Sequence, residues 1–203
     1  MIRLKNMPIN NRPTHWGWLA VLMHWSTALC VFGLFTLGLW MTGLDYYSPW
    51  YKQGPWIHKS IGVLLLLLTL LRLFMRLSLK APLPLESHKS GERMAAKATH
   101  MLLYALILII IMSGYLISTA DGRSIEVFSW FSVPATITIT GIQGEAQEEL
   151  AGSLHWYSAC ILMGLVGLHI LGALKHHIVD KDTTLLRMLR PYANKVIRKS
   201  QLK

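Results

Sequence analysis

The sequence predicts an all-α fold, an integral membrane four-helix transmembrane bundle formed by a single domain, residues 1–203. Of the 203 residues, 53% are hydrophobic and only 15% are charged, which is more apolar than a soluble domain of this size. The apolar residues fall in four blocks, each long enough to provide the roughly 20 residues that a helix needs to cross about 30 Å of hydrocarbon. Backbone polar groups must be satisfied inside a bilayer, so we expect these blocks to be helices.

The four predicted spans cover about residues 16–42, 57–77, 99–119 and 152–175. The first is too long for the apolar region of a cleavable signal peptide, and no small-residue cleavage site follows it. We therefore expect it to remain in the mature protein. The second contains the leucine-rich run from Ile61 to Leu71.

The distribution of charge predicts the orientation of the bundle. Seventeen of the 20 Lys and Arg residues lie on the side that holds both termini and the middle loop, and six of the ten acidic residues lie on the other side. The positive-inside rule places both termini in the cytoplasm of a multi-pass protein of the bacterial inner membrane. The net charge of +10 is then a consequence of topology, and no nucleic-acid partner is expected.

Three loops connect the predicted spans. An aromatic link, residues 45–56, lies at the outer interface, and a polar loop from Pro82 to Arg93 that includes His88 lies in the cytoplasm. The external loop, residues 121–152, contains Trp130 and an acidic stretch, Glu145 to Glu149, that can begin a short helix. This loop is too apolar to stay solvated, so we expect it to lie on the membrane or to cover a site.

The cysteines exclude several cofactor classes. Cys30 and Cys160 both lie inside spans, and the sequence has no Cys-x-x-Cys-His motif for covalent haem and no cysteine cluster for iron–sulfur or zinc. No Ser/His/Asp, Cys/His or paired-carboxylate set is placed for other catalysis, so no catalytic residue is predicted.

Four histidines occupy the predicted spans. His155 and His169 are fourteen residues apart in one helix, which places both on nearly the same face and about 21 Å apart along the axis. His24 in the outward-running first span lies at about the depth of His169. His58, at the start of the inward-running second span, lies at about the depth of His155. Topology alone therefore pairs His24 with His169 and His58 with His155.

These pairs are interpreted as axial ligands of two haem irons. A lone histidine on an apolar helix is more often a hydrogen-bonded core residue, but polar groups inside a membrane are costly unless they are used, and here the depths match in pairs. Two b haems, one at each depth, are the predicted cofactors. A zinc or copper transporter lined by the same histidines is the alternative chemistry.

Small and basic residues lie at the levels of the two pairs. Gly38, Gly62 and Gly114 leave room for a porphyrin edge, although close helix packing also favours glycine. Arg72 is fourteen residues beyond His58 and Arg76 lies one turn further, so each can pair with a haem propionate or simply extend to the interface.

Together these motifs resemble the prokaryotic cytochrome b-561 family of di-haem membrane cytochromes. The resemblance covers roughly Thr14 to Met188. It implies a four-helix bundle with two bis-histidine b haems that passes electrons between the periplasmic side and the quinone pool. The motifs that carry it are His24-Trp25, His58-x-x-x-Gly62, Arg72-x-x-x-Arg76, the His155/His169 pair, Lys175-His176-His177 and the segment Asp182-Thr183-Thr184-Leu185-Leu186-Arg187-Met188.

Electron transfer is the predicted function, because an iron with two protein ligands has no open position at which to activate oxygen. His176 follows His169 by two turns on nearly the same face, and Lys175 and Arg76 lie nearby. A titratable imidazole at the interface suits the proton uptake of quinone reduction, so these three residues form the predicted ubiquinone site. The other interpretation is a basic cytoplasmic cap that only sets topology.

The sequence leaves the partners open. The predicted contacts are membrane lipid, quinone, and a periplasmic donor that is either a small anion such as superoxide or a small soluble protein. A homodimer is a further alternative. The alternative function is a haem-bearing membrane anchor subunit of a hydrogenase or dehydrogenase, and the histidine-lined metal transporter is the third.

Overall fold

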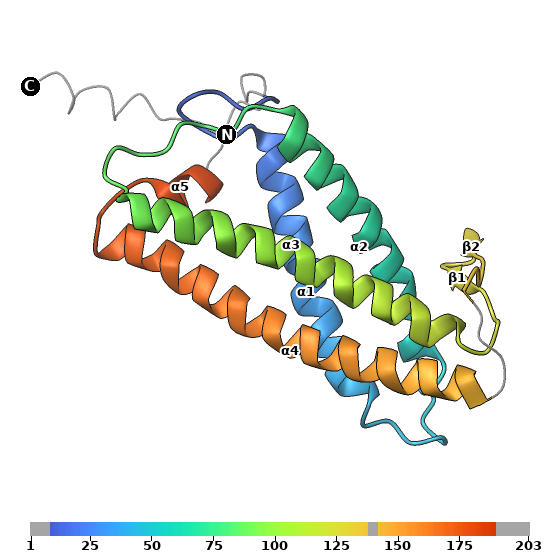
Figure 1. Cartoon of the computed structure of the whole chain (residues 1–203). Helices are drawn as coiled ribbons and strands as arrows, with labels where there is room; N and C mark the ends of the chain where they lie inside the picture. The colour runs from blue at the N-terminus through green and yellow to red at the C-terminus, as the bar shows by residue number, and fades with distance from the viewer. Residues whose placement is uncertain (1–8, 138–141, 190–203) are drawn as a thin grey trace, which may run out of the picture. The chain divides into compact units, whose positions relative to one another are not determined.

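The structure is a computed structural model that describes residues 9–137 and 142–189, and it is mostly helical, as predicted (Figure 1). Arg3, Lys5, the basic residues from Arg190 onward and residues 138–141 of the external loop lie outside the described residues. The elements are α1 (Trp18–Met41), α2 (Gln53–Ser78), α3 (Ser90–Thr119), β1 (Ile125–Val127), β2 (Phe131–Val133), α4 (Ile142–Ile178) and α5 (Thr184–Leu189).

Helices α1 to α4 are each long and apolar enough to cross a membrane, which confirms the predicted transmembrane helical fold. Large apolar side chains remain exposed along them, for example Leu29 at 75% and Leu77 at 79%. Such exposure is expected of helices whose outer surface faces lipid rather than water.

Three helices begin earlier than the predicted spans: α2 at Gln53, α3 at Ser90 and α4 at Ile142. The carboxylate of Glu92 accepts a hydrogen bond from the Lys89 amide at 3.0 Å, which satisfies a free donor just before α3. From the sequence, the acidic stretch from Glu145 to Glu149 is expected to begin a short helix. The structure shows no separate helix there. The stretch belongs to α4, since no proline interrupts the chain between it and the apolar span.

The chain divides into two compact units. The described residues up to Ser26, those from Leu70 to Ala98 and those from Gly167 onward form the first unit. The second unit comprises Thr27–Thr69 and Thr99–Val166. Each of the four long helices contributes residues to both units.

The second unit has an apolar core built from all four long helices. Its buried members are Val31 of α1, Leu65 of α2, Ile107 of α3 and Leu162 of α4, and Cys30 packs against them. Cys30 is thus a packing residue, whereas Cys160 is exposed.

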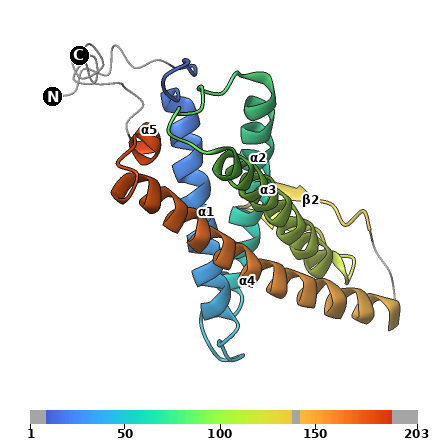
Figure 2. The ribbon, with the colours of Figure 1, turned by 60° about the vertical axis from the view of Figure 1, so that its left-hand side comes forward.

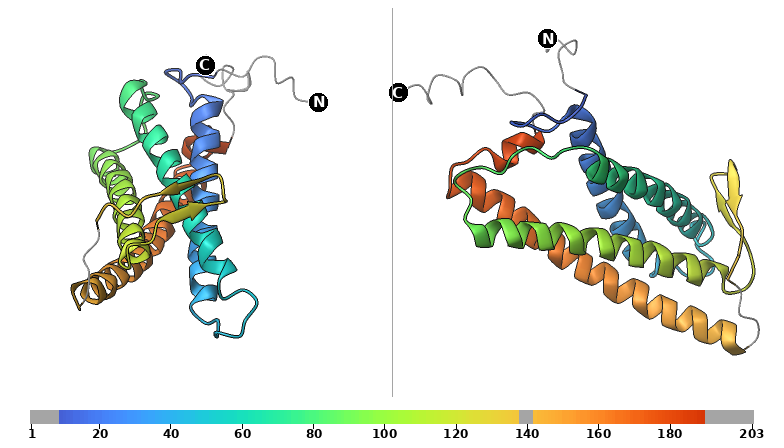
Figure 3. Two further views of the ribbon diagram at one scale, coloured as in Figure 1. Left: turned by 90° about the vertical axis from the view of Figure 1, so that its right-hand side faces the viewer. Right: turned by 45° about the horizontal axis from the view of Figure 1, so that its top comes forward.

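The second unit also holds a β-hairpin that the sequence did not predict. Strands β1 and β2 pair antiparallel, and the turn places Phe128 and Ser129 at positive φ, 47° and 59°. Ser60 of α2, which is fully buried, donates to the Glu126 carbonyl at 3.3 Å and accepts from the Phe128 amide at 3.2 Å. These bonds fix the hairpin beside α2 (Figure 3).

In the first unit, three chain segments are joined by hydrogen bonds to backbone carbonyls. The Leu83 amide donates to the Pro13 carbonyl, and the Arg187 guanidinium donates to the Leu83 carbonyl, both at 2.9 Å. The Trp25 indole donates to the Met188 carbonyl at 2.8 Å, which fixes the end of α5 against α1 (Figure 2).

Candidate functional site

The first unit brings His24 of α1 and His169 of α4 together. Both imidazoles are partly buried, and their ring centroids lie 6.2 Å apart at an interplanar angle of 57°. The guanidinium of Arg72 lies 2.7 Å from Nδ1 of His24, and the ring of Trp25 makes an edge contact with the same imidazole. The pairing predicted from depth is thus present as a contact.

The second unit brings His58 of α2 and His155 of α4 together. Their ring centroids are also 6.2 Å apart, at an interplanar angle of 63°. Nδ1 of His155 lies 2.9 Å from the Ile110 carbonyl and 3.3 Å from the Ser113 hydroxyl. Nδ1 of His58 is buried and has no hydrogen-bond partner among the described residues.

Both pairs fit the ligand set of a bis-histidine haem. When two imidazoles bind the same iron, each through a nitrogen at about 2 Å, their ring centroids lie about 6 Å apart. This separation matches both pairs. The buried Nδ1 of His58 has no hydrogen-bond partner among the described residues, which packing alone does not explain.

Two of the three predicted glycines line the His58/His155 pair. A Cβ atom at Gly38 would lie 3.4 Å from Cε1 of His58, and one at Gly114 would lie 3.1 Å from Cε1 of His155. A side chain at Gly114 would therefore press on the imidazole of His155, whereas one at Gly38 would only reach van der Waals contact with His58. A Cβ atom at Gly62 would meet nothing within 4 Å, so there is open space beside that residue.

The hydrogen bonds of the two pairs differ in kind. A backbone carbonyl can only accept, so His155 donates from Nδ1 to Ile110 and its Nε2 keeps a lone pair for a metal. A guanidinium can only donate, so Nδ1 of His24 accepts from Arg72.

The residues predicted for quinone binding occupy the first unit but do not form one contact set. Arg76 is exposed, and its guanidinium lies 5.3 Å from the centroid of the Trp16 ring. Lys175 pairs with Glu92 and with Asp180, the latter at 2.7 Å. Nδ1 of His176 lies 2.8 Å from the Asp180 carboxylate.

Around His176 the structure assembles a cluster that the sequence analysis missed. Asp182 places the same carboxylate oxygen 3.0 Å from Nε2 of His88 and 3.2 Å from Nδ1 of His176. Burial raises the pKa of Asp182, but hydrogen bonds from Thr184 and His88 outweigh it, so the pKa lies below its ordinary value. His88 is 88 residues before His176 in the chain, and no local pattern could have revealed their contact.

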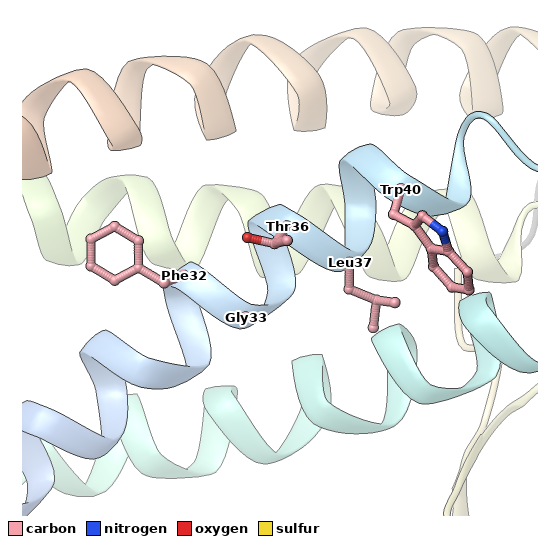
Figure 4. A pocket seen from close by; sticks show the side chains of 5 residues that line it. All are labelled: Phe32, Gly33, Thr36, Leu37 and Trp40. Carbon is pink, nitrogen blue, oxygen red and sulfur yellow. The ribbon is translucent and has the colours of Figure 1, made fainter.

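A recess of about 450 Å³ on the second unit is separate from its histidine pair. Five residues of α1 line it: Phe32, Gly33, Thr36, Leu37 and Trp40 (Figure 4). At about 100° per residue, Thr36 and Trp40 lie roughly opposite Gly38 on the helix, so the recess faces away from His58.

A family model described as prokaryotic cytochrome b561 matches residues 15–191 of the chain. The chain belongs to the prokaryotic cytochrome b561 family. Membership confirms the resemblance seen in the motifs. The chain is therefore a bacterial membrane protein that transfers electrons and uses b-type haem as its cofactor.

The chain is also similar to individual proteins from two bacteria. The chain is 46% identical to "Cytochrome b561 homolog 2" of Escherichia coli (strain K12) over 183 residues, 90% of this chain and 95% of that protein. It is 32% identical to "Probable superoxide oxidase CybB" of Yersinia pestis over 70% of this chain and 77% of that protein. It is 26% identical to "Cytochrome b561 homolog 1" of E. coli over 83% of this chain and 93% of that protein.

Proposed function

We propose that this cytochrome binds two b haems and transfers electrons between a periplasmic donor and the quinone pool of the bacterial inner membrane. The observation that carries the proposal is the presence of two imidazole pairs, each with ring centroids 6.2 Å apart. His24 and His169 would hold one haem, and His58 and His155 the other.

When bound, each haem supplies one-electron oxidation and reduction, and two histidine ligands leave its iron no open position for oxygen. Ile110 orients the imidazole of His155. Iron bound at Nε2 of His24 would require the imidazole proton on Nδ1, so Arg72 would then leave that nitrogen and turn its guanidinium toward a propionate. Arg72 also places a positive charge where a propionate would be neutralised. The fourteen-residue spacing on α4 assigns the two haems to different depths, so electrons would cross most of the hydrocarbon within one chain.

Quinone reduction is assigned to the cytoplasmic side, near His176. This residue follows His169 by seven positions, about 10 Å along the helix and on nearly the same face. Its side chain is 16% exposed, so it is accessible to solvent yet close to the apolar span. In this role His176 would deliver a proton to the reduced quinone, with Lys175 and Arg76 supplying positive charge nearby.

A small anionic donor is favoured on the periplasmic side. The printed name of the Y. pestis relative describes a superoxide oxidase. In this chain Lys59 is exposed directly after His58, and Lys52 is exposed in the preceding turn. Two exposed cations beside a haem pocket would attract a small anion such as superoxide.

The experiment combines haem counting with stopped-flow kinetics on the purified protein in detergent. A pyridine haemochrome assay should give two haems per chain. Reoxidation of the reduced protein by a short-chain ubiquinone should slow at least tenfold in His176→Ala while both haem spectra stay intact.

His177→Ala is the matched control for this experiment, because His177 is adjacent and exposed. His88→Ala would not serve, since His88 and His176 contact the same carboxylate. One haem per chain would refute the di-haem assignment. An unchanged rate in His176→Ala would move the quinone site away from this residue.

A further inference from the structure

The cluster of His88, His176 and Asp182 has the composition and spacing of a metal site distinct from the haem ligands. The three residues come from the loop before α3, the end of α4 and the turn before α5, and all lie in the first unit. Their ligand atoms, one per residue, all lie within 4.8 Å of one another. We propose that this cluster binds a divalent transition-metal ion of the zinc, copper or nickel class.

The ligand chemistry determines the class of ion. Two imidazole nitrogens and one carboxylate oxygen suit borderline ions, whereas calcium and magnesium prefer sites made only of oxygen. Atoms that each lie about 2.1 Å from one ion in tetrahedral geometry are about 3.4 Å apart. The Asp182 oxygen lies 3.0 and 3.2 Å from the two nitrogens, close to that value, and the two nitrogens lie within 4.8 Å of each other.

Hydrogen bonding alone leaves one nitrogen of the cluster unexplained. Nδ1 of His176 is buried and close to two carboxylates, at 2.8 Å from Asp180 and 3.2 Å from Asp182. Neither contact has the alignment of a hydrogen bond, and the nitrogen has no hydrogen-bond partner among the described residues. An ion between the ligands would satisfy it.

The surroundings hold the ligands in place. The Thr184 amide donates to the other oxygen of Asp182 at 2.8 Å, and the Thr184 hydroxyl lies 3.1 Å from Nε2 of His88. Outer contacts of this kind orient the ligands of metal sites. The histidine rings are close, with centroids 4.5 Å apart.

Access also suits a cation. The three carboxylates of Asp182, Asp180 and Glu92 balance the positive charges of Lys175, Arg187 and Arg93 around the cluster. The side chains of His88 and His176 are 17% and 16% exposed, which leaves a path for the ion from solvent.

Occupation would affect the cytochrome's activity only through His176. If the proposed quinone function is right, an ion bound to its Nδ1 would withdraw that imidazole from proton delivery and slow reoxidation by quinone. Binding of the ion does not depend on that function, so the two proposals can fail separately.

The test is isothermal titration of the haem-loaded protein in detergent with Zn²⁺, using a purification tag without histidine. We expect one Zn²⁺ per chain with a dissociation constant on the order of 1 µM, and at least a tenfold loss of affinity in Asp182→Asn and in His88→Gln. His177→Gln is the matched control and should bind as the wild type does. Unchanged haem spectra would show that each variant is folded.

A second measurement does not depend on the variants. Electron paramagnetic resonance of one equivalent of Cu²⁺ added to the wild type should show hyperfine coupling to two imidazole nitrogens, and His88→Gln should reduce it to one. Absence of stoichiometric Zn²⁺ binding, affinity that survives both substitutions, or Cu²⁺ bound without nitrogen would each overturn the proposal.

Discussion

The guanidinium of Arg72 lies 2.7 Å from Nδ1 of His24. Arg72 was predicted to lie at the level of the His24/His169 pair, where it can meet a propionate or extend to the interface. The contact places its charge directly beside a proposed haem ligand. A positive charge there stabilises the reduced haem relative to the oxidised haem.

Substitution of Arg72 should therefore shift the potential of one haem. In Arg72→Gln we expect the midpoint of the haem at the His24/His169 pair to fall by on the order of 50 mV, while the other stays unchanged. Arg72→Lys should retain most of the wild-type potential. Spectroelectrochemical titration measures both haems. A shift of both haems alike, or of neither, would remove Arg72 from this role.

Removal of one ligand should abolish one haem selectively. His155→Ala should lose the haem of the His58/His155 pair, and His169→Ala that of the other pair, because an alanine cannot replace an axial ligand. The pyridine haemochrome value should fall from two to about one in each variant. His177→Ala should keep both. Full haem content in a variant that lacks all four histidines would disprove the ligand assignment.

Gly114 should tolerate no side chain without cost to the neighbouring haem. A Cβ atom there would lie 3.1 Å from Cε1 and 3.3 Å from Nδ1 of His155, so Gly114→Ala should displace that ring from Ile110. We expect a perturbed spectrum and lower occupancy of this haem alone. Gly172→Ala is the control, because its Cβ atom would meet nothing within 4 Å. Identical spectra in the two variants would contradict the close approach.

Loss of the Ser60 hydroxyl should release the β-hairpin. Ser60→Ala would leave the Phe128 amide and the Glu126 carbonyl without their partner, which costs on the order of 1 kcal/mol for partly buried groups. Hydrogen exchange across residues 121–133 should become faster, whereas α3 should not change. Ser60→Thr, which keeps the hydroxyl, should restore protection if the added methyl group is accommodated. Unaltered exchange in Ser60→Ala would show that the strand pairing and the edge contact between the rings of Trp56 and Phe128 suffice.

Reporter fusions test the orientation. Fusions at Ser90 and at the C-terminus should report cytoplasm, and one near Glu145 should report periplasm, because 17 of the 20 basic residues lie on the predicted inner side. A periplasmic Ser90 would place the His24/His169 pair and His176 on the outer side and reverse the proposed direction of the electron path.

The sequence by itself determined the four membrane helices, the family and the two histidine pairs. Each of these follows from a regular property: the length of apolar blocks, the 3.6-residue period that brings His155 and His169 to one face, and the shared depth of residues on helices that cross one bilayer. Such properties need no knowledge of which helices touch.

Only the tertiary structure decided the contacts between segments far apart in the chain. Side-chain packing places Arg72 rather than Arg76 beside His24, and it anchors the hairpin through Ser60. It also brings His88 and His176 to the same carboxylate of Asp182. The hairpin turn uses Phe128 and Ser129 at positive φ, where glycine or asparagine is the usual signal, so tertiary contacts outweighed local preference. Long-range contacts of this kind have no sequence period, because the loops that create them follow no repeat.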